Sequence, residues 1–452
     1  MFRLVALPLA LFPVAALVAQ EDRPESLDQR VPRLIARLGA DDFGAREEAS
    51  RALLELGEDA IPFLEAARDA GDPEVRQRIR LLLRRIARTG FPGRKAERRA
   101  ELLRLEGGEG TEEAVDRGLD WLARHQSEGG LWDSDDFQAE CAVNTCSGRG
   151  TEWADPAQTG LALLAFLGAG HGREDAAHGA AVRKGLAALV ERQDDGGCIG
   201  PRTGHFLYNH AIATLALVDA FLLIGDEALR APMEKAIGFL GEARNHDLAW
   251  RYGIAPGDND TSVTSWALAA VLLAQRGGIA VPEGAMAGAR NWFDSVTDAN
   301  FRTGYIQAGD TGARLASQLG KYAPVESCTA IALASRIEMG ADRKDALLAG
   351  QADLISNCLP EWDTNGGPGG TSRIDFYYWY QGTQAMFQYG GPRWETWNAS
   401  LKTALVPHQR RDGDEAGSWD PIDAWGSEGG RVAGTALGVL ALETYYRHPR
   451  VE

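Results

Sequence analysis

Apolar residues recur along most of this chain at the three- and four-residue spacing typical of helices, in pairs of segments separated by short turns. From Thr111 on, the first segment of a pair is amphipathic, as in EEAVDRGLDWLARH, with charge on one face. The second segment is rich in Ala and Leu and carries little charge, as in SVTSWALAAVLLA. The pattern predicts half-exposed helices, each followed by a buried helix, and it recurs about every 45 to 60 residues.

Six such pairs can be found between residues 111 and 448. The buried helices are expected to begin at DPAQTG, FLYNHA, DTSVTS, VESCTA, FYYWYQ and GRVAGT. Six hairpins with buried inner helices and amphipathic outer helices predict an all-α fold, in which two concentric helical rings form an (α/α)6 toroid. The 53 glycines of the chain suit its tight turns.

A shorter helical region precedes the predicted toroid. Residues 28–88 combine helical apolar spacing with Gly- and Asp-containing breaks, and DPEVRQRI places Asp72 as an N-cap before Pro73. The stretch LGADDFGAREEASRALLELGEDAIPFL resembles HEAT repeats, and about two repeats bury little surface alone. We therefore expect this HEAT-like segment to pack on the toroid or on a partner. Residues 89–110 lose the apolar period and carry dense charge, which predicts a linker.

The first residues have the pattern of a secretory signal peptide over residues 1–19. Arg3 is their only charge, an apolar run extends from Leu4 to Val18, and Ala19 is a small residue at the cleavage position. Two prolines interrupt this run, which is shorter than the roughly 20 apolar residues of a spanning helix. We expect a secreted or periplasmic protein with no transmembrane segment.

The charge of the chain restricts its partners. Its formal net charge is -17, which disfavours nucleic acid and anionic lipid through electrostatic repulsion. The sequence has no Gly-rich phosphate loop, no nucleophile elbow and no thioester-forming Cys-Gly-Glu-Gln. Nucleotide chemistry and covalent acyl chemistry are therefore not expected, and no cofactor is predicted.

The chain has five cysteines, which is few for a disulfide scaffold. Cys141 and Cys146 are close enough in sequence for a disulfide if their loop turns back, and export would expose that loop to oxidation. We expect this disulfide, also because no metal partner is nearby in the sequence. Cys198, Cys328 and Cys358 remain unassigned.

A metal site could be drawn from Cys198, His205 and His210 in CIGPRTGHFLYNH. The spacing of these residues matches no known zinc module. Packing of Cys198 in a loop and capping of an inner helix by His210 account for both residues without a metal. The sequence therefore predicts no metal site.

A short repeat marks the turns of the predicted toroid. QSEGGLW, from Gln126 to Trp132, fits a QxxxGxW pattern, with degraded copies at Gln193 and Asn300. GSWDP, with Trp419, is a further copy whose Gln409 lies too far upstream. The chain resembles the terpenoid cyclase and protein prenyltransferase superfamily, and it is most similar to secreted prenyltransferase/squalene oxidase repeat-containing proteins. The resemblance implies a structural role, in which the Gln caps a helix end and the Trp stacks on a neighbour.

Squalene-hopene cyclases of that superfamily protonate an alkene with the middle Asp of DxDDT. Aligned on Asp260 and Thr261, this chain has GDNDT, with Gly257 and Asn259 in place of the first and middle Asp. An amide cannot donate that proton, so triterpene cyclisation is not expected. Asp260 or Thr261 is instead a good N-cap, and Asp258 lies where the helix dipole favours negative charge. The zinc ligands of protein prenyltransferases have no counterpart on the predicted inner helices.

The starts of the inner helices all point to one end of a toroid, so their polar residues are expected to meet at the barrel mouth. The candidates for acid–base chemistry are Asp258, Asp260, His210 and Asp375. The candidates for ligand binding are Tyr208, Tyr377, Tyr378, Trp379, Asp420 and Arg431, with Thr264 nearby. Aromatic side chains beside carboxylates suit sugar rings or apolar ligands, although FYYWY is equally compatible with core packing.

These residues predict that the barrel mouth binds a ligand or a partner, which can be a small molecule, a glycan or a protein. An alternative is an enzyme of the same fold that acts on an extracellular glycan as a lyase or hydrolase. A further alternative is an isoprenoid cyclase. A hydrophobic tunnel would favour the cyclase, whereas carboxylates with raised pKa values facing one cavity would favour acid–base chemistry.

Overall fold

The computed structural model describes residues 26–89, 102–108, 110–143, 146–310, 320–447 and 450. The expected signal peptide and most of the expected linker lie outside the described residues. Within the described ranges the chain is helical, and only isolated bridges connect extended residues.

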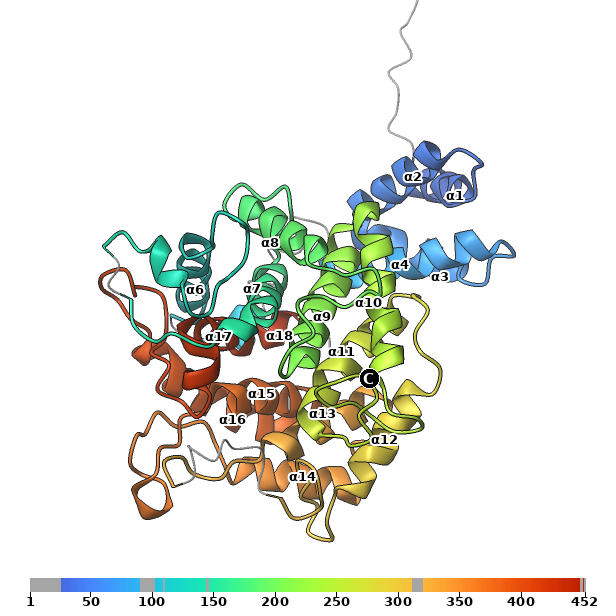
Figure 1. The fold of residues 1–452 in the computed structure, drawn as a ribbon. Coiled ribbons are helices and arrows are strands. Elements are labelled where there is room, and N and C mark those ends of the chain that lie inside the picture. The colour runs from blue at the N-terminus through green and yellow to red at the C-terminus, as the bar shows by residue number, and fades with distance from the viewer. Residues whose placement is uncertain are drawn as a thin grey trace, which may run out of the picture.

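Twelve of the described helices form six hairpins that close into two rings. The outer helices are α6 (Thr111–Arg124), α8 (Gly179–Glu191), α10 (Arg230–Ala243), α12 (Ala285–Ser295), α14 (Ala346–Ser356) and α16 (Gly391–Leu405). The inner helices are α7 (Asp155–Ala169), α9 (Phe206–Ile224), α11 (Thr261–Arg276), α13 (Ser327–Glu338), α15 (Phe376–Tyr389) and α17 (Gly426–Leu442). Each inner helix packs on the next, α17 packs on α7, and the outer helices surround them (Figure 1). The predicted (α/α)6 toroid is confirmed.

Five of the inner helices begin within the predicted stretches, whereas α17 begins at Gly426, four residues before the expected start at Gly430, where the backbone is not helical. The side chains of the inner helices are mostly buried. In α9 the buried residues run almost without interruption from Phe206 to Leu222. This helix is also long and apolar enough to cross a membrane, although 83% of its most apolar window is buried inside the protein. The expectation of no transmembrane segment did not take this helix into account. The position of α9 in the inner ring explains why it is so apolar.

The QxxxGxW turn that begins at Gln126 connects α6 to α8, its neighbour in the outer ring. The amide Nε2 of Gln126 donates to the carbonyl of Gly130 in its own turn and to that of Ala181 in α8, both at 2.9 Å. Gly130 has a φ of 86°, and a Cβ there would lie 2.4 Å from the carbonyl oxygen of Lys184. Only glycine fits this position, because the backbone is left-handed and the next helix is in contact.

The last turn closes the ring, which corrects the expectation for Gln409. Its Nε2 donates to the carbonyls of Gly417 at 2.8 Å and of Ala114, in α6, at 2.7 Å. The indole of Trp419 donates to the carbonyl of Leu405 at 2.9 Å, at the end of α16. A longer turn thus makes the same contacts as the standard repeat, and it joins the last outer helix to the first.

Two further turns follow the same plan with different residues. Arg244 replaces the Gln, since its guanidinium donates to the carbonyls of Leu248 at 3.3 Å and Glu283 at 3.0 Å. In the fourth hairpin the bridge pairs Thr297 with Thr303, as Gln193 pairs with Ile199 in the second. That copy therefore starts three residues before Asn300, the start expected from the sequence.

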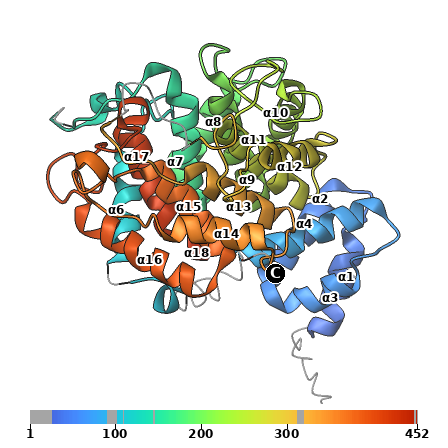
Figure 2. The ribbon, with the colours of Figure 1, turned by 90° about the horizontal axis from the view of Figure 1, so that it is seen from below.

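Four helices precede the toroid: α1 (Leu27–Arg37), α2 (Phe43–Leu56), α3 (Ile61–Ala66) and α4 (Pro73–Thr89). Their buried apolar side chains form a small core of their own. Arg46 and Arg76 donate in the same way to carbonyls five and six residues earlier in the chain. This repetition is compatible with the HEAT-like prediction, which remains a prediction. Figures 1 and 2 show the four helices at one side of the toroid, next to α9 and α10.

Candidate functional site

The inner helices begin at one end of the toroid, and acidic side chains cap two of them. Asp260 Oδ1 accepts from the Val263 amide at 2.7 Å at the start of α11. Asp375 Oδ1 accepts from the Tyr378 amide at 2.8 Å at the start of α15. Both carboxylates are buried, and each satisfies an amide that the first helical turn leaves without a partner.

Asp260 is more than a helix cap, because its second oxygen is also buried. Oδ2 makes no hydrogen bond of ordinary geometry and lies 3.9 Å from Nε of Arg251. Burial raises the pKa of Asp260 to about 7, although the capping amide, Arg251 and the nearby hydroxyl of Tyr305 lower it in part. A carboxyl that titrates near neutrality can donate or accept a proton.

The neighbours of Asp260 in GDNDT have other roles. Asn259 is buried, and its Oδ1 accepts from the amide of Ala249 at 3.0 Å and from Asn245 Nδ2 at 2.9 Å. This side chain therefore holds the loop in place. Asp258 is exposed and pairs with the guanidinium of Arg251. No proton donor lies at the position of the middle Asp of DxDDT.

Seven aromatic side chains that are exposed or half-buried surround this end of the barrel, and every inner helix or the loop before it contributes at least one. We call them the aromatic rim: Trp153, His205, Tyr208, Tyr252, Tyr305, Tyr377 and Trp425. The rings of His205 and Tyr252 stack with centroids 3.9 Å apart. The ring centroid of Trp153 lies 5.8 Å from that of His205, and the hydroxyls of Tyr252 and Tyr305 are hydrogen-bonded to each other.

The rim continues across the mouth to the last two hairpins. The hydroxyl of Tyr377 is hydrogen-bonded to that of Ser262 in α11 at 2.7 Å, and its ring lies 6.1 Å from that of Trp425. Burial raises the pKa of Tyr208, and the negative charge of Asp260 raises it further. The structure thus brings together three of the predicted residues, Tyr208, Asp260 and Tyr377.

Most of the aromatic run FYYWY is core. Tyr378 and Trp379 are each 1% exposed, and the hydroxyl of Tyr378 donates to the carbonyl of Cys358 at 2.7 Å. Trp379 packs edge-on against Phe376 at 5.4 Å. These two predicted ligand-binding residues are therefore structural, because consecutive residues of a helix point in different directions and only Tyr377 faces the mouth.

His210 is also structural. It is fully buried; its Nδ1 accepts from the amide of Ile199 at 3.1 Å and its Nε2 lies 3.0 Å from the carbonyl of Ala236. Burial lowers its pKa to about 3, so the ring stays neutral. The hydroxyls of Thr159 and Thr264 accept from the corresponding amides of Trp132 and Trp250. His210 thus replaces the threonine of the repeat, and neither it nor Thr264 belongs to the mouth.

Asp420 and Arg431 lie at the seam between the last and the first hairpin. Arg431 is fully buried and donates to Ser418 Oγ and to the carbonyl and hydroxyl of Ser147. It also pairs with Asp420 and Glu415, each at 2.8 Å. Its donors serve ring closure, so the prediction that this pair binds a ligand finds no support in the contacts.

The sequence interpretation missed Tyr252 and Tyr305, although their positions follow a rule. Each lies two residues after the last position of its turn repeat, which is Trp250 in one turn and Thr303 in the other. Aligning the turns would have found both. Asp423 was also missed: burial and the charge of Asp375 raise its pKa to about 7.

A cavity of about 100 Å³ lies between the inner helices, toward their C-terminal ends. Its lining includes the stacked rings of Trp266 and Tyr380, whose centroids are 5.6 Å apart. Charged side chains, among them Arg276, Glu338 and Arg447, line the same space. This cavity is small and its walls are partly charged, so it differs from the hydrophobic tunnel expected of a cyclase that acts on large isoprenoids.

A separate cluster lies at the C-terminal end of α6. The sulfurs of Cys141 and Cys146 are each 3.4 Å from Nε2 of His125, and no disulfide joins them in the structure. Both the expected disulfide and the expected absence of a metal partner ignored His125, which is 16 residues before Cys141 but beside it in space. Burial lowers the pKa of His125 and raises that of Cys146 to about 12. The other metal-ligand set considered from the sequence, Cys198 with His205 and His210, is not formed, because both ring nitrogens of His210 have partners within the protein.

No protein-family model and no curated protein matches the chain. Several solved structures do. The GH76A α-1,6-mannanase from Salegentibacter sp. HEL1_6 has a TM-score of 0.51 at 11% identity, covering 74% of this chain and 98% of that chain. An α-amylase from Clostridium perfringens has a TM-score of 0.49 at 14% identity, covering 75% and 99%. The type II terpene cyclase MstE from Scytonema has a TM-score of 0.48 at 13% identity, covering 74% of this chain and 98% of that chain.

At such identities the comparison concerns the fold alone. The mannanase likeness and the closed double ring described above agree with the sequence-based expectation. The chain has an all-helical α/α toroid fold.

Proposed function

We propose that the protein binds a carbohydrate at the barrel mouth through the aromatic rim. The observation that carries this proposal is that seven aromatic side chains, at least one from each hairpin, are left exposed or half-buried at one end of the barrel. Aromatic side chains are normally buried when they serve the core, and clusters that stay accessible mark binding surfaces. Their faces suit the C–H faces of sugar rings.

Polar groups between the rings favour a hydroxylated ligand over an apolar one. The rim carries tyrosine hydroxyls and the ion pair of Arg251 with Asp258. These groups provide donors and acceptors that can orient a sugar. An isoprenoid would remove these groups from water without offering them a hydrogen-bond partner, which costs free energy.

The test is binding of the purified protein to soluble polysaccharides, with α-1,6-mannan as one probe because one solved structure of similar fold is an α-1,6-mannanase. Tyr252→Ala is expected to weaken binding about two- to tenfold, as loss of one aromatic contact does. Phe43→Ala, at an exposed aromatic of α2, is the matched control and should bind like the parent. Equal affinities of the Tyr252 variant and the parent would contradict the proposal, as would a folded parent that binds no polysaccharide.

Turnover of the bound glycan is a second candidate function, favoured by the raised pKa of Asp260. Binding stands first because Asp260 is fully covered and does not reach the surface. If the protein is a hydrolase or lyase, Asp260→Asn should abolish release of new chain ends while polysaccharide binding persists. The same release by parent and variant, or none by the parent, would exclude this role for Asp260.

A further inference from the structure

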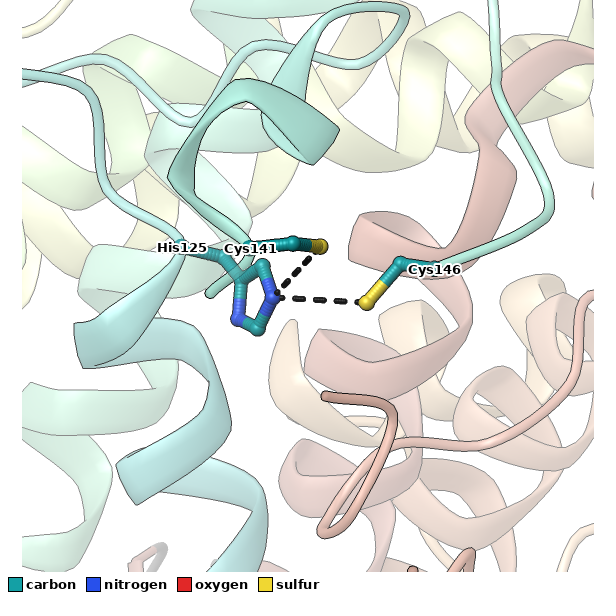
Figure 3. Close-up of side chains that lie close together, drawn as sticks. All are labelled: His125, Cys141 and Cys146. Carbon is teal, nitrogen blue, oxygen red and sulfur yellow. Dashed lines mark hydrogen bonds between the residues drawn. The ribbon is translucent and has the colours of Figure 1, made fainter. Parts of the chain in front are cut away.

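We propose that His125, Cys141 and Cys146 form a binding site for zinc or a similar transition-metal ion. Figure 3 shows the two sulfurs turned toward the same edge of the imidazole ring. His125 ends α6, whereas the cysteines lie on the loop that leads to α7. The ligand atoms all lie within 4.8 Å of one another. This site is separate from the mouth and does not depend on the carbohydrate proposal.

The spacing of the three atoms fits a tetrahedral ion. Zinc binds thiolate sulfur at about 2.3 Å and imidazole nitrogen at about 2.0 Å, which separates the two ligand atoms by about 3.5 Å. Both sulfurs lie 3.4 Å from His125 Nε2. Little rearrangement is needed, because an ion can enter between groups that already face one another. Two thiolates and an imidazole bind zinc in preference to magnesium or calcium, which favour oxygen ligands.

The imidazole is held in the tautomer that a metal needs. Nδ1 of His125 lies 2.8 Å from the carbonyl oxygen of Trp121, which can only accept. The proton is therefore on Nδ1, and the lone pair on Nε2 faces the sulfurs. The ring also stacks on the indole of Trp121, with centroids 4.2 Å apart and planes at 22°. The contacts with Trp121 therefore fix the orientation of the His125 ring.

The surroundings suit a site that gives up protons on binding. Both thiols lose a proton when the ion binds, so that two thiolates and one divalent cation carry no net charge. The buried guanidinium of Arg431 is already paired with Glu415 and Asp420, which limits its repulsion of a cation. Cys141 is half-buried, so water can supply the fourth ligand.

The position of the site suggests what the ion does. The loop that carries the cysteines contacts the last turn of the toroid: the Val143 amide donates to Asp414 at 3.0 Å, and the Ser147 amide donates to Glu415 at 2.9 Å. An ion that ties this loop to α6 would hold the seam between the first and the last hairpin. We therefore expect the metal to be structural.

The experiment uses the full chain, purified without chelator or added reductant. Its zinc content is measured by mass spectrometry, and cobalt is added to protein from which metal has been removed. We expect one equivalent of zinc and, with cobalt, a thiolate charge-transfer band. Zinc should also raise the melting temperature and protect Cys141 and Cys146 from alkylation. Cys146→Ser is expected to lower zinc affinity by more than about 100-fold, since even loss of an outer partner costs about 10- to 100-fold.

Cys358→Ser is the matched control, because this half-buried cysteine lies two residues after the end of α14, in another hairpin. It should bind one equivalent like the parent. A Cys141–Cys146 disulfide in place of metal in the isolated protein overturns the proposal. So does equal zinc affinity of the Cys146 variant and the parent. The cobalt spectrum and the alkylation of the parent decide the matter if the variant fails to fold.

Discussion

Asp260 shows how one residue can serve helix geometry and proton chemistry together. Its Oδ1 satisfies the amide of Val263, which holds the carboxyl at the start of α11. The same placement buries Oδ2 and raises the pKa to about 7. The contacts of this residue therefore support the helix cap predicted from GDNDTS, and its raised pKa adds a property that capping does not require.

The raised pKa predicts a definite pH dependence of stability. A carboxyl with an unfolded pKa of about 3.9 and a folded pKa near 7 binds its proton more tightly when folded. Its contribution to the free energy of unfolding is therefore largest below about pH 4 and declines as the pH rises toward about 7. Asp260→Asn, which retains a capping oxygen, should reduce the loss of stability between about pH 5 and about pH 8.

Urea unfolding of parent and variant at both pH values measures this difference. Asp258→Asn is the control, since Asp258 is exposed on the same loop, and it should leave the pH dependence closer to that of the parent. Identical pH profiles for parent and Asp260→Asn would contradict the raised pKa.

At the scale of elements, the turns between hairpins determine how the rings close. Four of the turns use one long polar side chain, a Gln or an Arg, to connect their own loop to the next outer helix or to a residue just before it, and the last of these turns does so with a longer loop. These turns share the same hydrogen bonds although their residues differ, because the position requires only a side-chain donor that reaches two carbonyl oxygens.

Gln409 is expected to matter more than a surface glutamine because it makes the closing contacts. Gln409→Ala leaves the buried carbonyls of Ala114 and Gly417 without this donor, which should lower the free energy of unfolding by about 1–3 kcal/mol. Gln307→Ala, in an exposed loop, is the control and should change it by less than about 0.5 kcal/mol. Chemical denaturation compares the two, and equal losses would disprove the closing role.

At the scale of the whole molecule, the apolar side chains form two separate clusters, one in the toroid and one in α1–α4. The contact between them runs mainly through α4 and α9, with Leu81 packed against the larger cluster. Separate cores are the usual sign of units that fold on their own.

We therefore expect the toroid to fold after deletion of residues 20–88. The truncated protein should keep a single cooperative thermal transition, at a somewhat lower temperature because Leu81 and its contacts are lost. Calorimetry of the truncated and full-length proteins provides the comparison. A broad transition without a heat-absorption peak would show that the toroid depends on the preceding helices.

The sequence by itself determined the helices, their order and the double ring. Apolar spacing is a local property, so the burial of α9 or α11 on every side can be read from neighbouring residues. The cap at Asp260 and the absence of a donor at Asn259 follow from local chemistry in the same way. A turn such as QSEGGLW could be recognised because its contacts lie within a few residues.

Only the tertiary structure decided which side chains meet. It separated Tyr377 from its buried neighbours Tyr378 and Trp379, and it placed His125 beside two cysteines of a distant loop. The physical reason is that such meetings depend on ring closure and on the direction of each side chain, and both are set by packing over the whole chain. Spacing along the sequence records neither.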